Sequence, residues 1–503
     1  MSILQVNDLT FCYEGSFENI FENVSFHVDT DWKLGLVGRN GKGKTTFLNL
    51  LMGKYDYSGS ITCSSRFDYF PYPIREGDRM RSISELCETW KSGVEQWRVI
   101  CELGSLQADP EILYRPISTL SQGQLTKAML AVLFSGENEF LLIDEPTNHL
   151  DRTGREVITE YLSGKKGFIL VSHDRVLLDA LCDHMLVLNR SSIEVASGNF
   201  SVWWENKERK DSFAKAENEK HLKQISKLRS SADRTLRWAE KSEQTKIGFD
   251  PVKEHDRCLS TRSYIGAKTK KMQSRVKNFE KRMEQEIAEK EGLLNDIESV
   301  ADLKLMPLSH HKSCLVEARD LSLSYDPEGA SPVIKDLTFS AMQGDILFLK
   351  GENGCGKSTL IKAILQTAEC RITGGSLSVA SGLVLSYVSQ DTSFLKGTLK
   401  DYAKEKDLDL SLLLTLLRKL DLGRSQFEKN MEDFSEGQKK KVLIAASLLT
   451  PAHLYIWDEP LNYIDVFSRM QIEKLIETYH PTMILVEHDD YFRQKLATKT
   501  TEL

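Results

Sequence analysis

The sequence contains no run of about 18 consecutive apolar residues, the length that a membrane-spanning helix requires. Its first residues, MSILQVNDLTFCYEGS, lack a basic stretch followed by an apolar stretch, so no secretory signal is expected. The nine cysteines are scattered and never form a CxxC pair, which argues against a disulfide framework or a cysteine-based zinc site. We therefore expect a cytoplasmic protein with reduced thiols and roughly two to four domains.

The charge of the chain is unevenly distributed. The net charge is −7, but residues 221–280 hold 15 Lys and Arg against 7 Asp and Glu, a net of +8 that leaves about −15 on the rest. A basic segment on an acidic protein indicates one local contact with a polyanion. The alternative is a solvated, charged helix, which is what charge runs more commonly form.

A repeat of motifs divides the chain. The loop GRNGKGKT at 38–45 recurs as GENGCGKS at 351–358. A tyrosine, a serine, an aspartate and a histidine lie at −31, +77, +100 and +129 from Lys44, and at −32, +78, +101 and +131 from Lys357. These pairs are Tyr13 and Tyr325, Ser121 and Ser435, Asp144 and Asp458, and His173 and His488. The repeat predicts a first cassette over 1–200, a middle segment over 201–313 and a second cassette over 314–503.

Each cassette has the pattern of an α/β domain, because short apolar runs such as KLGLVG and FLLIDEP alternate with helical stretches. The middle segment differs. From Trp203 to about Glu243, and again from about Gly266 to Ile297, apolar or small residues recur every three or four positions. A glycine and a proline between these stretches would interrupt a helix. The predicted fold is two tandem P-loop domains joined by an antiparallel helical hairpin, with a tip loop at about 244–264.

Both repeated loops match GxxxxGK[ST] after an apolar strand, which is a strong signal for nucleotide binding. Their glycines let backbone N–H groups approach phosphates, while Lys44 and Lys357 would neutralise the β- and γ-phosphates of ATP. Thr45 and Ser358 would each place a hydroxyl on Mg²⁺. A glycine turn without a nucleotide is the alternative. The predicted ATP-binding residues of the two loops are Gly38, Asn40, Gly41, Gly43, Lys44, Thr45, Thr46, Gly351, Asn353, Gly354, Gly356, Lys357, Ser358 and Thr359.

An acidic pair ends an apolar strand in each cassette, in FLLIDEP and LYIWDEP. Asp144 and Asp458 suit the holding of Mg²⁺. Glu145 and Glu459 follow them and are placed to orient and deprotonate the attacking water. Such a pair could instead cap a helix, but its repeated distance from the lysine favours catalysis.

Two short motifs, LSQGQ at 120–124 and FSEGQ at 434–438, resemble the LSGGQ signature of ATP-binding cassette proteins. In that superfamily each signature faces the phosphate loop of the other cassette, and a helix N-terminus with a serine suits a γ-phosphate. The resemblance thus implies two composite sites, which pair Lys44 and Glu145 with Ser435 and Gly437, and Lys357 and Glu459 with Ser121 and Gly123. It also implies that His173 and His488 contact the γ-phosphate and that Tyr13 and Tyr325 stack on adenine.

The two cassettes differ at the position of the family's Mg²⁺-contacting glutamine. YVSQD places Gln390 there in the second cassette, whereas YFPYP places Tyr72 there in the first. Tyrosine has no amide oxygen to offer a metal. We therefore expect the site containing Lys44 to hold Mg²⁺ through water or to hydrolyse ATP more slowly, so that the two sites are unequal.

Paired cassettes joined by a basic hairpin resemble the ABC-F family, whose members act on the ribosome. Over nearly its full length the chain is most similar to the Lsa and Vga antibiotic-resistance group, and to the Lsa type above all, in stretches such as DTDWKLGLVGRNGKGKTT, GNFSVWWENK and YIWDEPLNYIDV. The resemblance implies a monomer, with no membrane or DNA partner, whose ATP-bound cassettes occupy the tRNA exit site of the 70S ribosome. The hairpin would reach 23S rRNA and P-site tRNA and displace lincosamide, streptogramin A or pleuromutilin drugs. ATP hydrolysis would then release the protein.

The basic hairpin can contact RNA phosphates with salt-dependent affinity. Aromatic and apolar residues of the tip could stack on unpaired bases or could pack at the hairpin end. The candidate RNA-contacting residues are Arg234, Arg237, Phe249, Leu259, Tyr264, Lys268, Lys270, Lys271 and Arg275.

Two alternative functions stay open. A housekeeping ABC-F translation factor would act on ribosomes without opposing antibiotics. Some such factors carry an extra arm in the first cassette, yet the 49 residues from Tyr72 to Ser121 nearly match the 45 from Gln390 to Ser435. The energy-supplying subunit of a drug exporter would need a membrane partner. A DNA-repair ATPase would bring zinc motifs or much longer coiled coils, and we find neither pattern in the sequence.

Overall fold

The structure is a computed structural model, which describes 2–14, 19–137, 139–148, 150, 152–189, 192–244, 281–282, 303–325, 332–352, 354–367, 370–487 and 489–503. The chain forms two compact units. One unit combines Met1–Trp203 with Val300–Leu503 and so contains both cassettes, and the other is Trp204–Ser299.

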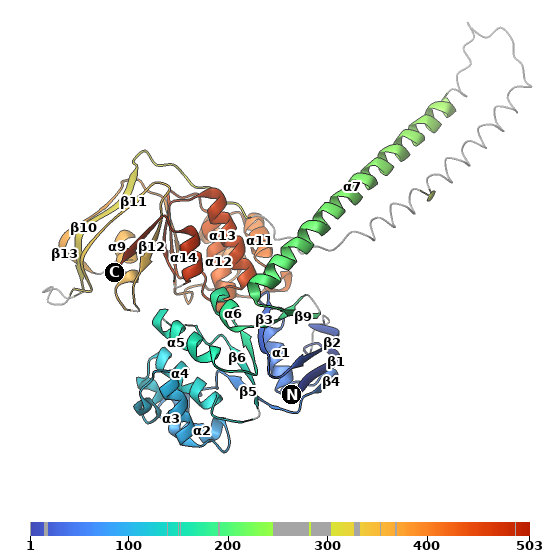
Figure 1. Cartoon of the computed structure of the whole chain (residues 1–503). Helices are drawn as coiled ribbons and strands as arrows, with labels where there is room; N and C mark the ends of the chain where they lie inside the picture. Colours follow the sequence, from blue (N-terminus) through green and yellow to red (C-terminus); the bar gives the residue numbers. More distant parts are fainter. Residues whose placement is uncertain are drawn as a thin grey trace, which may run out of the picture. The chain divides into compact units, whose positions relative to one another are not determined.

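The first cassette is built on a six-stranded sheet in the order β5-β6-β7-β3-β8-β9. Figure 1 labels β3, β5, β6 and β9 of this sheet. All neighbouring strands run parallel except β8 and β9, which form an antiparallel pair. The strands are β3 (Lys33–Gly38), β5 (Arg66–Phe70), β6 (Glu139–Asp144), β7 (Phe168–Val171), β8 (His184–Leu188) and β9 (Ile193–Ser197). A separate antiparallel sheet contains β1 (Ile3–Phe11), β2 (Phe21–Asp29) and β4 (Ser58–Thr62).

Helices connect the parallel strands of this cassette, as parallel pairing requires. They are α1 (Lys44–Leu51), α2 (Ile83–Trp90), α3 (Gln96–Ser105), α4 (Gln122–Leu133), α5 (Arg152–Ser163) and α6 (Arg175–Leu181). The central strands β3 and β6 are apolar apart from their charged end residues, and β7 is apolar and buried at all four positions. This burial explains why the strands appear in the sequence as continuous hydrophobic runs.

The second cassette repeats the architecture with a five-stranded parallel sheet in the order β14-β15-β16-β12-β17. Its strands are β12 (Ile346–Lys350), β14 (Leu385–Val388), β15 (Leu454–Asp458), β16 (Met483–Val486) and β17 (Lys499–Glu502). The antiparallel sheet is β10 (Cys314–Ser324), β11 (Ile334–Met342) and β13 (Arg371–Val379). The helices are α9 (Lys357–Ile364), α10 (Leu399–Glu405), α11 (Leu410–Lys419), α12 (Glu436–Leu449), α13 (Val466–Tyr479) and α14 (Asp490–Leu496).

The two cassettes have separate hydrophobic cores. Phe47 of α1 and Phe140 of β6 are fully buried in the core of the first cassette. Trp457 of β15 is fully buried in the second. Leu303 and Leu305, which the sequence analysis placed in the middle segment, are also buried in this second core. The predicted α/β fold with two tandem P-loop domains is therefore confirmed.

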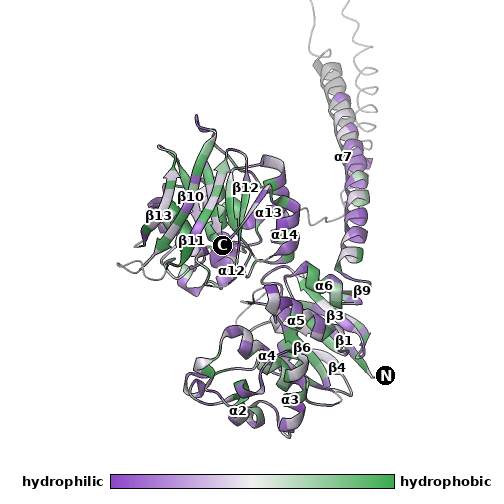
Figure 2. Ribbon diagram, turned by 60° about the vertical axis from the view of Figure 1, so that its left-hand side comes forward, coloured by the Kyte–Doolittle hydropathy of each residue, from purple (hydrophilic) through white to green (hydrophobic). Residues whose placement is uncertain are grey.

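The middle segment begins with one long helix, α7 (Phe200–Gln244), of 45 residues. It starts close to Trp203, where the sequence predicts a helix. Figure 2 shows α7 as largely hydrophilic, in contrast to the strands of the cassettes. None of the helices in the described ranges combines the length and the hydrophobicity that crossing a bilayer requires. The predicted tip loop and most of the second helix of the hairpin lie outside the described residues.

Candidate nucleotide-binding sites

The two phosphate loops have the same strand–loop–helix geometry. Each connects a central strand, β3 or β12, to the N-terminus of a helix, α1 or α9. Gly43 and Gly356 cap these helices with φ of 93° and 102°. A Cβ atom on Gly43 would meet Ile20 Cγ2 at 2.6 Å, and one on Gly356 would meet Ile334 Cγ1 at 2.8 Å. Only glycine therefore fits at these two positions, and the loops lead to helix N-termini that suit an anion.

The two loop lysines are held in matching ways. Lys44 Nζ donates to the carbonyl oxygen of Gly38 at 2.7 Å, and Lys357 Nζ donates to that of Gly351 at 2.8 Å. Both lysines are the first residues of their helices. The ammonium groups therefore lie within the loops, at the helix ends where phosphates would bind.

An oxygen-donor pair lies beside each loop. Thr45 Oγ1 donates to Asp144 Oδ2 at 3.4 Å, and Ser358 Oγ donates to Asp458 Oδ2 at 3.2 Å. Burial raises the pKa of Asp144, and burial together with Glu459 raises the pKa of Asp458 to about 6. A hydroxyl and a carboxylate are hard oxygen ligands of the type that Mg²⁺ prefers, so both pairs fit this ion.

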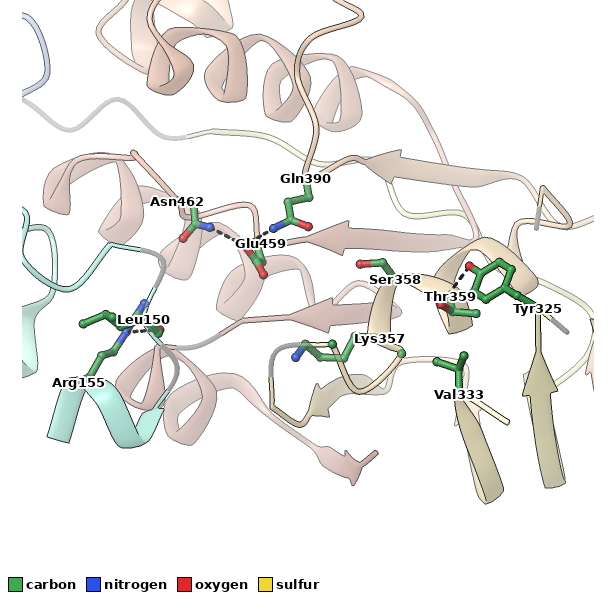
Figure 3. A pocket seen from close by; sticks show the side chains of 12 residues that line it. Leu150, Arg155, Tyr325, Val333, Lys357, Ser358, Thr359, Gln390, Glu459 and Asn462 are labelled. Carbon is green, nitrogen blue, oxygen red and sulfur yellow. Dashed lines mark hydrogen bonds between the residues drawn. The ribbon is translucent and has the colours of Figure 1, made fainter. Parts of the chain in front are cut away.

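The glutamates that follow these aspartates share an uncommon backbone conformation. Glu145 has φ 52° and Glu459 has φ 47°, both in the left-handed region. Non-glycine residues adopt this region at a cost of roughly 1–3 kcal/mol, and such strain concentrates at functional sites. In the second cassette, the Glu459 carboxylate accepts hydrogen bonds from Gln390 Nε2 at 2.9 Å and Asn462 Nδ2 at 2.6 Å (Figure 3).

Glu145 lies in a different environment from Glu459. His173 Nε2 is 3.4 Å from Glu145 Oε1, and the His173 backbone N–H donates to Glu145 Oε2 at 3.4 Å. Burial, with a smaller contribution from Asp144, raises the pKa of Glu145 to about 8. Burial and the charge of Lys44 lower the pKa of His173 well below its usual value. At neutral pH the histidine is therefore uncharged and most of Glu145 is protonated.

This raised pKa predicts how the first site responds to pH. In a Glu459→Gln variant, the residual ATP hydrolysis is expected to rise about tenfold per pH unit below pH 8 and to level off above it, because only the carboxylate form of Glu145 can accept a proton from water. His173 does not titrate in this range, since its pKa is lowered. Steady-state phosphate release between pH 6 and 9 tests the prediction, and a flat profile would contradict it.

The predicted adenine-stacking tyrosines lie next to the phosphate-loop helices. The Tyr13 and Thr46 hydroxyls are 2.7 Å apart, and those of Tyr325 and Thr359 are 3.2 Å apart. Both tyrosines are exposed, Tyr13 at 40% and Tyr325 at 51%, and the Tyr13 ring also contacts Phe11 and Tyr55 edge-on. Tyr325 shares a cavity of about 480 Å³ with Lys357, Ser358, Gln390 and Glu459 (Figure 3).

The two signature motifs form helix N-termini. Ser121 caps α4 by accepting from the Gln124 N–H at 3.2 Å, and Ser435 caps α12 by accepting from the Gln438 N–H at 3.3 Å. Each helix therefore begins with a serine hydroxyl beside free N–H groups, the arrangement that the signature motif predicts.

Both predicted composite sites bring residues of the two cassettes together, since Leu150 and Arg155 line the cavity of Lys357, but among the described residues a signature motif adjoins a phosphate loop in the first site. A Cβ atom on Gly437 would lie 3.2 Å from Asn40 Nδ2, and this amide donates to the Tyr463 carbonyl oxygen at 2.8 Å. The first phosphate loop thus adjoins the second signature. Ser121 and Gly123, in contrast, line a separate cavity of about 340 Å³ together with other residues of the first cassette.

Some predicted site residues cannot be located. Asn353 and His488 lie outside the described residues, and of the candidate RNA-contacting residues only Arg234 has a described side chain, which is exposed on α7. Conversely, the sequence analysis missed Asn462, which binds Glu459, and Tyr69, which binds Asp144 at 3.0 Å. The sequence does contain a signal for Tyr69. It lies three residues before Tyr72, as Tyr387 lies three residues before Gln390.

The fold and the two sites define a pair of P-loop nucleotide-binding cassettes. The chain belongs to the ABC transporter family, which matches residues 21–148 and 334–462.

Similar proteins include the ribosome protection protein VmlR of Bacillus subtilis, which is 26% identical over 96% of this chain and 84% of that protein. The erythromycin resistance ATP-binding protein MsrA of Staphylococcus epidermidis is 27% identical over 94% of this chain and 92% of that protein. The ATP-binding protein Uup of Buchnera aphidicola is 27% identical over 99% of this chain and 80% of that protein.

Among solved structures, the complex of an archaeal ribosomal stalk protein with the archaeal ribosome recycling factor aABCE1 matches with a TM-score of 0.58 and 18% identity. The match covers 98% of this chain and 87% of that chain. At this identity the likeness supports the fold alone.

Proposed function

We propose that this chain is an ABC-F ATPase of the Lsa type that binds the 70S ribosome and protects it from antibiotics. The observation that carries the proposal is the combination of two sets of ATP-site residues with a basic segment between them. Residues 221–280 carry a net charge of +8, and they overlap the long helix α7. An ATP-driven closure of the cassettes would then act on a partner rich in phosphate.

The chemistry proposed for each cassette is hydrolysis of ATP with Mg²⁺. Lys44 and Lys357 bind phosphates, and the hydroxyl–carboxylate pairs of Thr45 with Asp144 and Ser358 with Asp458 hold the ion, which neutralises developing charge when bound. Glu145 and Glu459 accept the proton of the attacking water. His173 and His488 contact the γ-phosphate, and the serine and glycine of each signature complete the opposite site.

The ribosome is the proposed partner because the basic segment 221–280, with a net charge of +8, suits a partner rich in phosphate, and this segment begins on the long helix α7. The side chains of α7 between residues 204 and 224 are exposed or half-buried. The similarity to VmlR, a ribosome protection protein, and to MsrA, an erythromycin resistance protein, supports this partner. We propose that the hairpin reaches 23S rRNA and P-site tRNA and displaces lincosamide, streptogramin A or pleuromutilin drugs, and that the protein works as a ribosome-associated monomer in the cytoplasm.

Ribosome capture tests the proposed partner. The Glu145→Gln/Glu459→Gln double variant is expected to remain bound to 70S ribosomes with ATP, because removing both proton acceptors blocks the hydrolysis that releases the protein. Co-sedimentation through a sucrose cushion measures the bound fraction. The Lys44→Ala/Lys357→Ala variant is the matched control, since it lacks the phosphate-binding lysines and should not stay bound. Equal sedimentation of the two variants would contradict the proposal.

A housekeeping ABC-F translation factor is the second candidate function, and the similarity to Uup, named only as an ATP-binding protein, favours it. The two candidates differ in the response of cells to drugs. Expression of the chain is expected to raise the inhibitory concentration of a lincosamide or a pleuromutilin, whereas the Glu145→Gln/Glu459→Gln variant should not. Ribosome binding without any change in drug susceptibility would favour the housekeeping function.

A further inference from the structure

The tyrosine that occupies the glutamine position of the first cassette does not face the nucleotide site. The Tyr72 hydroxyl donates to Asp68 Oδ2 at 2.7 Å, and its ring stacks on Trp90 with centroids 5.1 Å apart. Tyr72 is only 6% exposed. Lys91, which is 3.0 Å from Asp68, holds the carboxylate that Tyr72 binds. These contacts hold Tyr72 away from Asp144. The first site therefore has no side chain from this position that corresponds to Gln390 in the second site.

Another tyrosine reaches the site instead. The Tyr69 hydroxyl donates to Asp144 Oδ2 at 3.0 Å, and the same oxygen accepts from Thr45 Oγ1 at 3.4 Å. A phenol oxygen that donates one hydrogen bond still has lone pairs with which to accept another.

The second cassette has a tyrosine at the same place but uses it differently. Phe70 pairs with Ile143 and Val388 pairs with Trp457, so Tyr69 and Tyr387 occupy equivalent positions next to the strands that carry the aspartates. Tyr387 interacts with Ser389 through its side chain. Gln390 donates to Glu459 in this cassette, whereas Asp458 accepts from Ser358.

We propose that Tyr69 is the positioning residue for Mg²⁺ in the first site, where it does the work that Gln390 does in the second. Its hydroxyl orients Asp144 and offers an oxygen to a water molecule of the ion's hydration shell. A phenol oxygen replaces an amide oxygen, so the first site relies on contact through water. This inference rests on the proposed binding of ATP with Mg²⁺.

The test measures metal dependence rather than hydrolysis. The full-length chain with Lys357→Ala, which disables the second site, is titrated with MgCl₂ in the presence of a fluorescent ATP analogue. Adding Tyr69→Phe is expected to raise the Mg²⁺ concentration for half-maximal binding about tenfold or more, because partners of metal ligands contribute 10–100-fold to metal affinity. Binding of the analogue in EDTA should not change, which shows that the variant is folded.

Tyr387→Phe in the same Lys357→Ala background is the matched control and should leave the Mg²⁺ titration unchanged. Tyr72→Phe removes a hydroxyl from the other tyrosine of the first cassette and should also leave it unchanged. An unshifted titration for Tyr69→Phe, or a shift of the same size in either control, would overturn the assignment of Tyr69. Failure of the Lys357→Ala parent to bind the analogue at any Mg²⁺ concentration would instead overturn the proposed function of the site.

Discussion

The Glu145→Gln/Glu459→Gln double variant is expected to hydrolyse ATP about 10²–10⁴-fold more slowly than the unaltered chain, which is the contribution of a positioned general base. The two single variants, Glu145→Gln and Glu459→Gln, should lose different fractions of the ATP hydrolysis rate. At pH 7 only about a tenth of Glu145 is ionised, since its pKa is about 8. Glu459→Gln should therefore remove about nine-tenths of the activity, and Glu145→Gln much less.

Steady-state phosphate release at pH 7 measures these rates, and binding of ATP to each variant shows that the site is intact. The asymmetry has a structural reason, because Glu459 is held by the amides of Gln390 and Asn462, whereas Glu145 is half-buried beside Asp144. Equal losses of phosphate release in the two single variants would show that the two sites hydrolyse ATP equally, and would contradict this structural reason.

Replacing Lys441 with methionine is expected to lower the stability of the second cassette by about 3–5 kcal/mol, the cost of leaving one partner of a buried ion pair uncompensated. Lys441 Nζ donates to Asp465 Oδ2 at 2.8 Å, and the two side chains are 2% and 0% exposed. Burial alone would raise the pKa of Asp465, but the charge of Lys441 outweighs it and lowers this pKa. The carboxylate therefore stays ionised, and in the variant it would keep the hydrogen bonds from Ser468 but lose the ammonium group that it binds.

Hydrogen exchange of the backbone amides in β15 reports the opening free energy of this core. Lys439→Met is the matched control, because Lys439 lies on the same helix as Lys441 but pairs at 3.1 Å with Glu436, whose side chain is 51% exposed. The control should change the opening free energy by less than about 1 kcal/mol, as for a surface ion pair. The prediction would be contradicted if Lys441→Met lowered the opening free energy of β15 by no more than the control variant does.

The parts of the sites that depend on local sequence could be predicted. A glycine loop between an apolar strand and a helix fixes its own geometry, so Lys44 and Lys357 lie where the motif predicts. The strand-end aspartates meet the loop hydroxyls because parallel strands bring their carboxyl ends to one edge of the sheet.

The parts that depend on tertiary packing could not be predicted. Motif spacing identifies Tyr72 as the counterpart of Gln390, but only packing against Trp90 and Asp68 turns it away from Asp144. The run KKK at 439–441 is typical of a solvated helix face, yet Lys440 and Lys441 are buried. Their partners, a carbonyl at Ser389 and a carboxylate at Asp465, lie far away in the sequence, so no local pattern signals the burial.

The uninterrupted helix α7 has a mechanical consequence. Its first turn holds Phe200 and Trp203, both buried, and the Trp203 ring contacts Phe467 of α13 with centroids 6.1 Å apart. The helix then continues without a break to Gln244. At 1.5 Å per residue it is about 67 Å long. A rotation of about 10° at its base would therefore move its far end by about 12 Å. A long, unbroken helix therefore converts a small rotation at its N-terminal end into a displacement of its C-terminal end that is larger than many small molecules.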